Sequence, residues 1–117
     1  MRQIEPIYVN DHGTSFYWKQ SDGIVTDKVQ LVFKETGFYF SEEELETFAR
    51  LIEDSCRKNT CDGCAMRHEC VKFLLKTPVS QIDLAVSMYE LNGIKDLVQG
   101  TLFRMQLQKF VFGIGRN

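Results

Sequence analysis

Two stretches of this sequence join a strand-like segment to a helix-like segment through the same short signal. In each stretch a serine is followed three residues later by a glutamate: Ser41 with Glu44, and Ser87 with Glu90. This spacing is typical of a capping box, in which the two residues exchange side chain-to-backbone hydrogen bonds at a helix start. Two helices that each begin directly after a strand limit the chain to folds that mix helices with sheet.

The residues before Ser41 predict two β-hairpins in series. Gly13–Gln20 and residues 24–33 are rich in aromatic and β-branched residues, and the Ser-Asp-Gly between them is typical of a turn. A second hairpin is expected where residues 38–40 follow residues 34–37. We expect Gly37 to supply the positive φ that such a turn needs.

A helix is predicted from Ser41 to about Ser55, because apolar residues recur there at helical spacing. The second half of the chain repeats the order of the first. Residues 71–75 and 81–86 are strand candidates, and a helix is expected over residues 88–109. The apolar stripe of the first helix consists of Leu45, Phe48, Leu51 and Ile52.

These elements predict an α+β fold of two consecutive ββα units, with a mainly antiparallel sheet and two helices. A cysteine-rich loop, residues 56–70, is expected between the units, and all 117 residues are expected to form one domain. The repeated order has two explanations. The chain contains an internal duplication whose halves pack as pseudo-equivalent units, or any strand followed by a capped amphipathic helix gives the same pattern.

The last predicted helix has an unusual composition. It contains Gly93 and Gly100, each of which costs about 1 kcal/mol relative to alanine inside a helix. Apolar residues near its end cover more than one face, so the segment is either buried on most sides or packs against a second copy of the chain as a homodimer. These residues are Leu102, Phe103, Met105, Leu107, Phe110, Val111 and Phe112.

All the cysteines of the protein lie within fifteen residues, with the spacing C-x4-C-x2-C-x5-C: Cys56, Cys61, Cys64 and Cys70. The two residues between Cys61 and Cys64 let both sulfurs reach one ion, and Gly63 gives that turn the backbone freedom it needs. Four thiolates suit a tetrahedral zinc ion, which would stabilise a loop that has little apolar material of its own. The spacing therefore predicts a structural zinc site with these four ligands.

Two other interpretations of the cysteines remain open. One is an iron–sulfur cluster, since C-x4-C-x2-C also opens the plant-type [2Fe–2S] pattern. Residues 61–70 moreover resemble the opening of the auxiliary-cluster motif in the SPASM extension of radical-SAM enzymes. That resemblance implies a [4Fe–4S] cluster but no activity, since the chain has no radical-SAM core. The other interpretation is that the thiols bind no metal, or form disulfides under oxidising conditions.

Charge and composition limit the classes of binding partner and the cellular location that we expect for the protein. The formal net charge is −2, so the chain lacks the basic field that favours nucleic acid or an anionic membrane. The first residues lack the apolar stretch of a signal peptide, and no apolar run is long enough to span a bilayer. We expect a cytoplasmic protein, in which thiols stay reduced.

No catalytic group is recognisable in the sequence. His68 lies between Cys64 and Cys70 but is not needed as a ligand when four thiols are present. A nucleophilic Cys64 assisted by His68 is not favoured, because no carboxylate or amide is placed to orient the histidine. We therefore expect no enzymatic activity.

Residues 30–48, QLVFKETGFYFSEEELETF, and the junction at residues 84–97 resemble a group of small uncharacterised bacterial proteins. In that group a strand ending in F-x-F-[ST] enters an E-E-L-x-x-F helix, which implies the same fold and no particular activity. Our functional hypothesis is a non-catalytic, zinc-stabilised binding or adaptor module with a protein partner. The alternatives are an iron–sulfur redox or electron-transfer protein and a metal-free scaffold.

Overall fold

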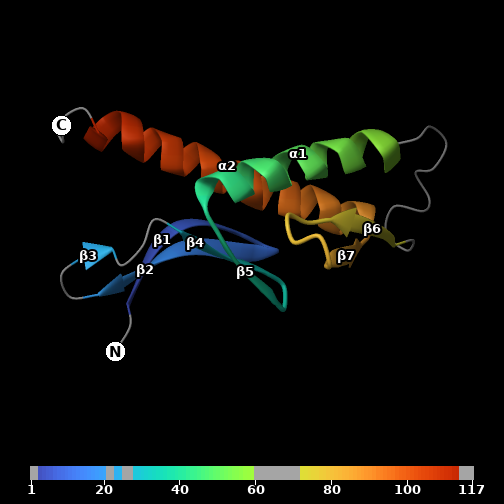
Figure 1. The fold of residues 1–117 in the computed structure, drawn as a ribbon, viewed down its shortest axis with the longest axis horizontal. Coiled ribbons are helices and arrows are strands. Elements are labelled where there is room, and N and C mark those ends of the chain that lie inside the picture. The colour runs from blue at the N-terminus through green and yellow to red at the C-terminus, as the bar shows by residue number, and fades with distance from the viewer. Residues whose placement is uncertain (1–2, 21–22, 25–27, 60–71, 114–117) are drawn as a thin grey trace.

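The computed structural model describes residues 3–20, 23–24, 28–59 and 72–113, and Figure 1 shows their arrangement. These residues confirm the predicted α+β class. Their elements in chain order are β1 (Gln3–Asn10), β2 (Gly13–Gln20), β3 (Gly23–Ile24), β4 (Val29–Phe33), β5 (Thr36–Phe40), α1 (Glu42–Asn59), β6 (Phe73–Lys76), β7 (Asp83–Val86) and α2 (Met88–Gly113).

The strands form two antiparallel sheets. The larger has the order β1-β2-β4-β5, with β3 paired to β2, and the smaller is the β6–β7 hairpin. Both helices lie on one side of the larger sheet, and α2 runs across it past the start of α1 (Figure 1). The helices contact each other, α2 contacts β1 and α1 contacts β6. Each unit therefore ends in a helix, and the two helices share one core.

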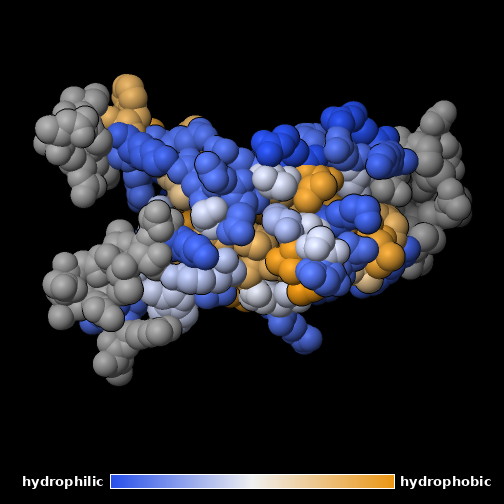
Figure 2. Space-filling model, viewed as in Figure 1, coloured by the Kyte–Doolittle hydropathy of each residue, from blue (hydrophilic) through white to orange (hydrophobic). Residues whose placement is uncertain are grey.

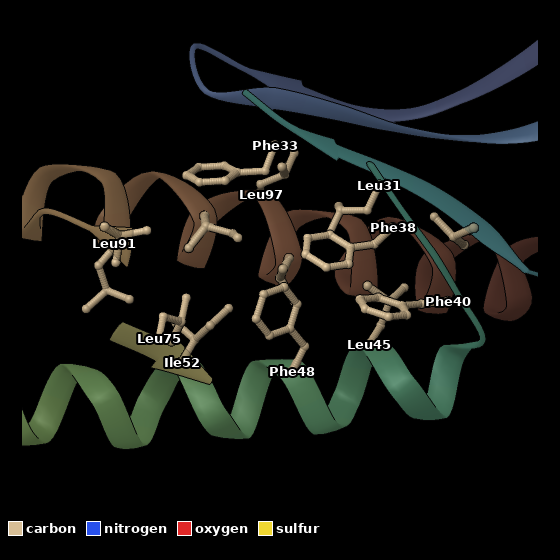
Figure 3. Close-up of a cluster of buried hydrophobic side chains, with 14 of the residues drawn as sticks. Leu31, Phe33, Phe38, Phe40, Leu45, Phe48, Ile52, Leu75, Leu91 and Leu97 are labelled. Carbon is tan, nitrogen blue, oxygen red and sulfur yellow. The ribbon is translucent and has the colours of Figure 1, made fainter. Parts of the chain in front are cut away.

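The core lies between the helices and the larger sheet. Alternate residues of β4 and β5 point into it, as expected for strands with one buried face. Phe48 of α1 lies edge-on to Phe38 and Phe40, with ring centroids 5.7 and 6.0 Å apart (Figure 3). Three of the four residues of the predicted α1 stripe are fully buried and Leu51 is half-buried. The fully buried three are Leu45, Phe48 and Ile52.

The first unit has more strands than predicted. β1 was not among the predicted strands, and it contains Pro6, which cannot donate a backbone hydrogen bond to a neighbouring strand. The structure places β1 at the sheet edge, and the pairing with β2 shifts register between Pro6 and Tyr8. An edge position and a bulge are the places where a strand tolerates proline. The predicted segment 24–33 is also divided, since Ile24 belongs to β3 and the strand beside β2 begins at Val29.

The prediction that Gly37 supplies the positive φ of the β4–β5 turn is wrong. Lys34 has the positive φ, at 55°. Phe33 pairs with Thr36, so the turn consists of two residues and Gly37 already lies within β5. The Lys34 amide donates a hydrogen bond to the His12 carbonyl oxygen at 2.9 Å, which holds this turn against the neighbouring β1–β2 turn.

The remaining boundaries differ by a few residues. α1 continues past the predicted end at Ser55 to Asn59, so Cys56 belongs to the helix and not to a loop. β6 covers Phe73–Lys76, one residue beyond the predicted segment 71–75, and β7 covers Asp83–Val86 within the predicted segment 81–86. α2 extends past the predicted end at residue 109 to Gly113. The rest of the predicted cysteine-rich loop, residues 60–70, lies outside the described residues.

Candidate functional site

Cys56, the first cysteine of the predicted metal site, lies in the last turns of α1. Its side chain is 8% exposed and belongs to the same core cluster as Ile52 and Leu75. Burial raises the pKa of its thiol; the nearby charge of Lys95 lowers that pKa, and the charge of Glu53 raises it. This environment favours the protonated thiol, whereas a metal ligand must be a thiolate.

The other three predicted ligands, Cys61, Cys64 and Cys70, lie outside the described residues. Within the part of the chain that the structure describes, no three His, Cys, Asp or Glu side chains are grouped to hold a metal ion. The four-cysteine site thus stays a prediction from spacing. α1 precedes the segment that carries these three cysteines, and Lys72 and β6 follow it.

Glu90 connects three parts of the molecule at the start of α2. Its carboxylate accepts a hydrogen bond from the Ser87 amide at 2.9 Å, and its own amide donates to Ser87 Oγ at 3.2 Å, which confirms the predicted capping box. The same carboxylate pairs with Lys34 of the β4–β5 turn and, at 3.1 Å, with Lys72 before β6. The hydrogen bond from Lys34, followed by those from the Ser87 backbone and Lys72, lowers the pKa of Glu90 to about 2.

One side of α2 is built for close approach to the β1–β2 hairpin. A Cβ atom on Gly100 would lie 2.4 Å from Tyr8 Cζ, and a Cβ on Gly93 would lie 2.1 Å from His12 Nδ1. The two glycines are seven residues apart, so they share one face of the helix. The cost of two glycines in a helix is therefore offset by aromatic rings that pack directly on the α2 backbone.

Asp96 fixes this contact by hydrogen bonds. Its Oδ2 accepts from the Tyr8 hydroxyl and from Asn10 Nδ2, both at 2.9 Å, and Asn10 Nδ2 also donates to the Gly93 carbonyl at 3.0 Å. The hydrogen bond to Asp96 is the main cause of a raised pKa for Tyr8. Tyr8 therefore acts as a hydrogen-bond donor that positions β1.

The C-terminal half of α2 carries an exposed apolar stripe, which we call the α2 stripe and define as Phe103, Leu107, Phe110 and Val111. Their exposed fractions are 63%, 45%, 69% and 54%. Met105, between them in sequence, is buried at 3% and faces the core. In the view of Figure 2, a small hydrophobic protrusion stands at the C-terminal end of α2 among mostly hydrophilic residues.

The charged residues next to the α2 stripe have partners within the same chain. Lys109 pairs with Glu42 at the start of α1, and its pKa is raised by that hydrogen bond. The Arg104 guanidinium lies 5.7 Å from the centre of the Tyr8 ring and donates to the Ile7 carbonyl at 3.4 Å. The stripe itself is thus left as an uncharged apolar surface.

The chain matches no family model, no curated protein and no solved structure. In the described residues, neither helix is both long and apolar enough to cross a lipid bilayer.

Sequence reasoning missed two of these features. The contacts of Glu90 with Lys34 and Lys72 join distant parts of the chain, and no local sequence pattern predicts them. The contact between β1 and α2 did have a signal: Gly93 and Gly100 lie on the same helix face, and two glycines so spaced indicate a surface approached closely by another element.

Proposed function

We propose that this protein is a non-catalytic binding or adaptor module that docks a protein partner through the α2 stripe. The exposure of Phe103, Leu107 and Phe110 on one helix face is the observation that carries the proposal. Single exposed apolar residues are ordinary on soluble proteins, but contiguous large ones on one face mark interaction sites. The two phenylalanines are also of the aromatic class that interfaces favour.

A mutational test separates the stripe from general surface hydrophobicity. We expect a double variant, Phe103→Ser with Phe110→Ser, to fold normally and to lose a specific protein partner that wild type retains. Tyr89→Ser is the matched control, because Tyr89 lies on the same helix with the same exposed fraction as Phe103, 63%. Quantitative affinity capture followed by direct binding to the purified partner would measure this. Equal binding by all three proteins would refute docking through the stripe.

The second part of the proposal is a structural zinc ion held by Cys56, Cys61, Cys64 and Cys70. The four-cysteine spacing supports it, as does the position of Cys56 at the end of α1, directly before the segment that carries the other three. When bound, zinc would cross-link this segment to α1 and stabilise the fold. Participation of Cys56 requires its thiol to lose a proton, which burial opposes and Lys95 favours.

Elemental analysis tests the metal. Protein purified without oxygen and without a metal affinity column should carry about one zinc per chain and show no visible absorbance. Cys64→Ser should lose the zinc, whereas Cys56→Ala tests whether the buried thiol is a ligand or only a core residue. Iron with matching sulfide would instead favour the redox alternative. Absence of any metal would leave a metal-free scaffold.

A further inference from the structure

We propose that the partner of the α2 stripe is a second copy of this chain. The two α2 helices pack antiparallel about a two-fold axis that passes close to Leu107. This inference rests on the docking role proposed above and names its occupant.

The spacing within the stripe is that of a helix–helix seam. Phe103, Leu107 and Phe110 follow at intervals of four and three residues, the alternation by which two helices keep one apolar edge in contact. This edge lies opposite the core-facing side, which carries the buried Val98, Thr101 and Met105 of the same turns. A second helix can therefore lie along α2 without displacing any core contact.

The charge distribution suits a symmetric partner. Across a two-fold axis each residue near the axis meets its own copy, so a charged residue there would face an identical charge. Gln106 and Leu107, the residues nearest the proposed axis, are both uncharged. Among the residues that the structure describes, the cations nearest the axis are Arg104 and Lys109, which contact Tyr8 and Glu42 of their own chain. Two copies can thus meet along the stripe without like charges in contact.

The position of Asp96 favours antiparallel over parallel packing of the two α2 helices. Asp96 lies on the same helix face as Leu107, about three turns earlier, and its carboxylate accepts two hydrogen bonds from β1. Parallel helices would place Asp96 of one copy against Asp96 of the other. Antiparallel packing about Leu107 separates the two carboxylates by about 30 Å. In that register Phe103 of one copy faces Phe110 and Val111 of the other.

The size of the stripe sets the expected affinity. Four side chains of this kind expose a few hundred Å², below the roughly 800 Å² per partner of a standard stable interface. We therefore expect a reversible dimer with a dissociation constant on the order of micromolar. Its population should rise with protein concentration.

A charge-swap experiment tests the pairing. Sedimentation velocity over a range of concentrations, with all thiols kept reduced, should show a monomer–dimer equilibrium for wild type. Leu107→Glu and Leu107→Lys should each raise the dissociation constant at least about a hundredfold, because each would bury two like charges at the axis. Mixing equal amounts of the two variants should restore a dimer. Asn92→Glu, an exposed substitution on the same helix away from the seam, should leave dimerisation unchanged.

Two results would overturn the inference. One is a wild-type protein that stays monomeric up to about millimolar concentration. The other is a wild-type dimer that the Leu107 variants leave intact, or that their mixture fails to restore. If dimerisation fails while capture of another protein still depends on Phe103 and Phe110, the docking role stands and only its occupant is wrong. Far-ultraviolet circular dichroism of each variant confirms that the exposed substitutions leave the fold intact.

Discussion

The two helices begin in the same way and then use their surfaces differently. Ser41 and Glu44 exchange hydrogen bonds of 2.8 and 3.2 Å at the start of α1, and Ser87 and Glu90 exchange bonds of 2.9 and 3.2 Å at the start of α2. From there α1 buries one apolar stripe and turns polar residues to solvent. α2 buries one face. Its opposite face packs against β1 in the first half of the helix and carries the exposed α2 stripe in the second half.

This difference shows which surfaces of a helix can be assigned from the spacing of its own residues. The apolar stripe of α1 faces one core, so helical spacing alone identifies its buried side. The contact of α2 with β1 depends on an element distant in sequence. Gly93 and Gly100, which look costly inside a helix, are the residues that let His12 and Tyr8 pack closely on it.

The largest expected difference between the helices comes from equivalent aromatic deletions. Phe48→Ala should lower the free energy of unfolding by about 3–5 kcal/mol, because Phe48 is fully buried and its loss opens a cavity. Phe103→Ala should change it by less than about 0.5 kcal/mol when the protein is monomeric, since Phe103 is exposed. Urea unfolding of dilute protein measures both. A loss of several kcal/mol for Phe103→Ala would mean that the stripe is core rather than interface.

The next largest effect on stability is expected where Gly93 and Gly100 of α2 contact the β1–β2 hairpin. Gly100→Ala should destabilise the protein by about 1–3 kcal/mol, although the same change normally stabilises a helix, because the new Cβ would overlap the Tyr8 ring. In a Tyr8→Ala background the ring is gone, and Gly100→Ala should then stabilise by about 1 kcal/mol. A double-mutant cycle by urea unfolding measures the reversal. The same sign in both backgrounds would contradict the proposed close packing.

The features of the fold predicted from sequence are those with a local cause. Both capping boxes and the α1 stripe depend on residues within one or two helical turns, and the structure confirms them. β1 was not predicted, and its place in the sheet depends on pairing with β2, with a register shift between Pro6 and Tyr8 that a local pattern does not reveal. The positive φ falls on Lys34 because tertiary contact with the His12 carbonyl and the strand register place the turn there.

For the candidate sites, too, the sequence predicts what has a local cause and misses what depends on tertiary structure. The cysteine spacing predicts a metal site, but spacing cannot tell that Cys56 continues α1 and enters the core. The crowded end of α2 left two interpretations, burial and a second copy, because periodicity alone does not show where the core ends. The structure exposes Phe103, Leu107 and Phe110, which is why we propose the second.

The smallest expected effect distinguishes the two capping boxes. Glu90→Gln keeps a residue that can close the box but removes its charge. Because the pKa of Glu90 is lowered from 4.5 to about 2, its ion pairs stabilise the protein fully above the unfolded-state pKa. That stabilisation is lost as the pH falls from about 4.5 towards 2. At pH 7 we expect Glu90→Gln to cost on the order of 1 kcal/mol, since both lysines are half-exposed and their ion pairs are screened.

Glu44→Gln is the matched control at the other box. Glu44 makes the same backbone hydrogen bond to Ser41, and in the described part of the chain no lysine lies within ion-pair distance of it. Its replacement should change the free energy of unfolding by less than about 0.5 kcal/mol at pH 7. Urea unfolding at several pH values should show the gap between wild type and Glu90→Gln closing as the pH falls from 5 to 3. Equal, pH-independent effects at both boxes would mean that Lys34 and Lys72 add nothing at Glu90. If the stability difference from wild type closes with falling pH only for Glu90→Gln, the ion pairs of Glu90 with Lys34 and Lys72 hold the β4–β5 turn and the start of β6 against α2.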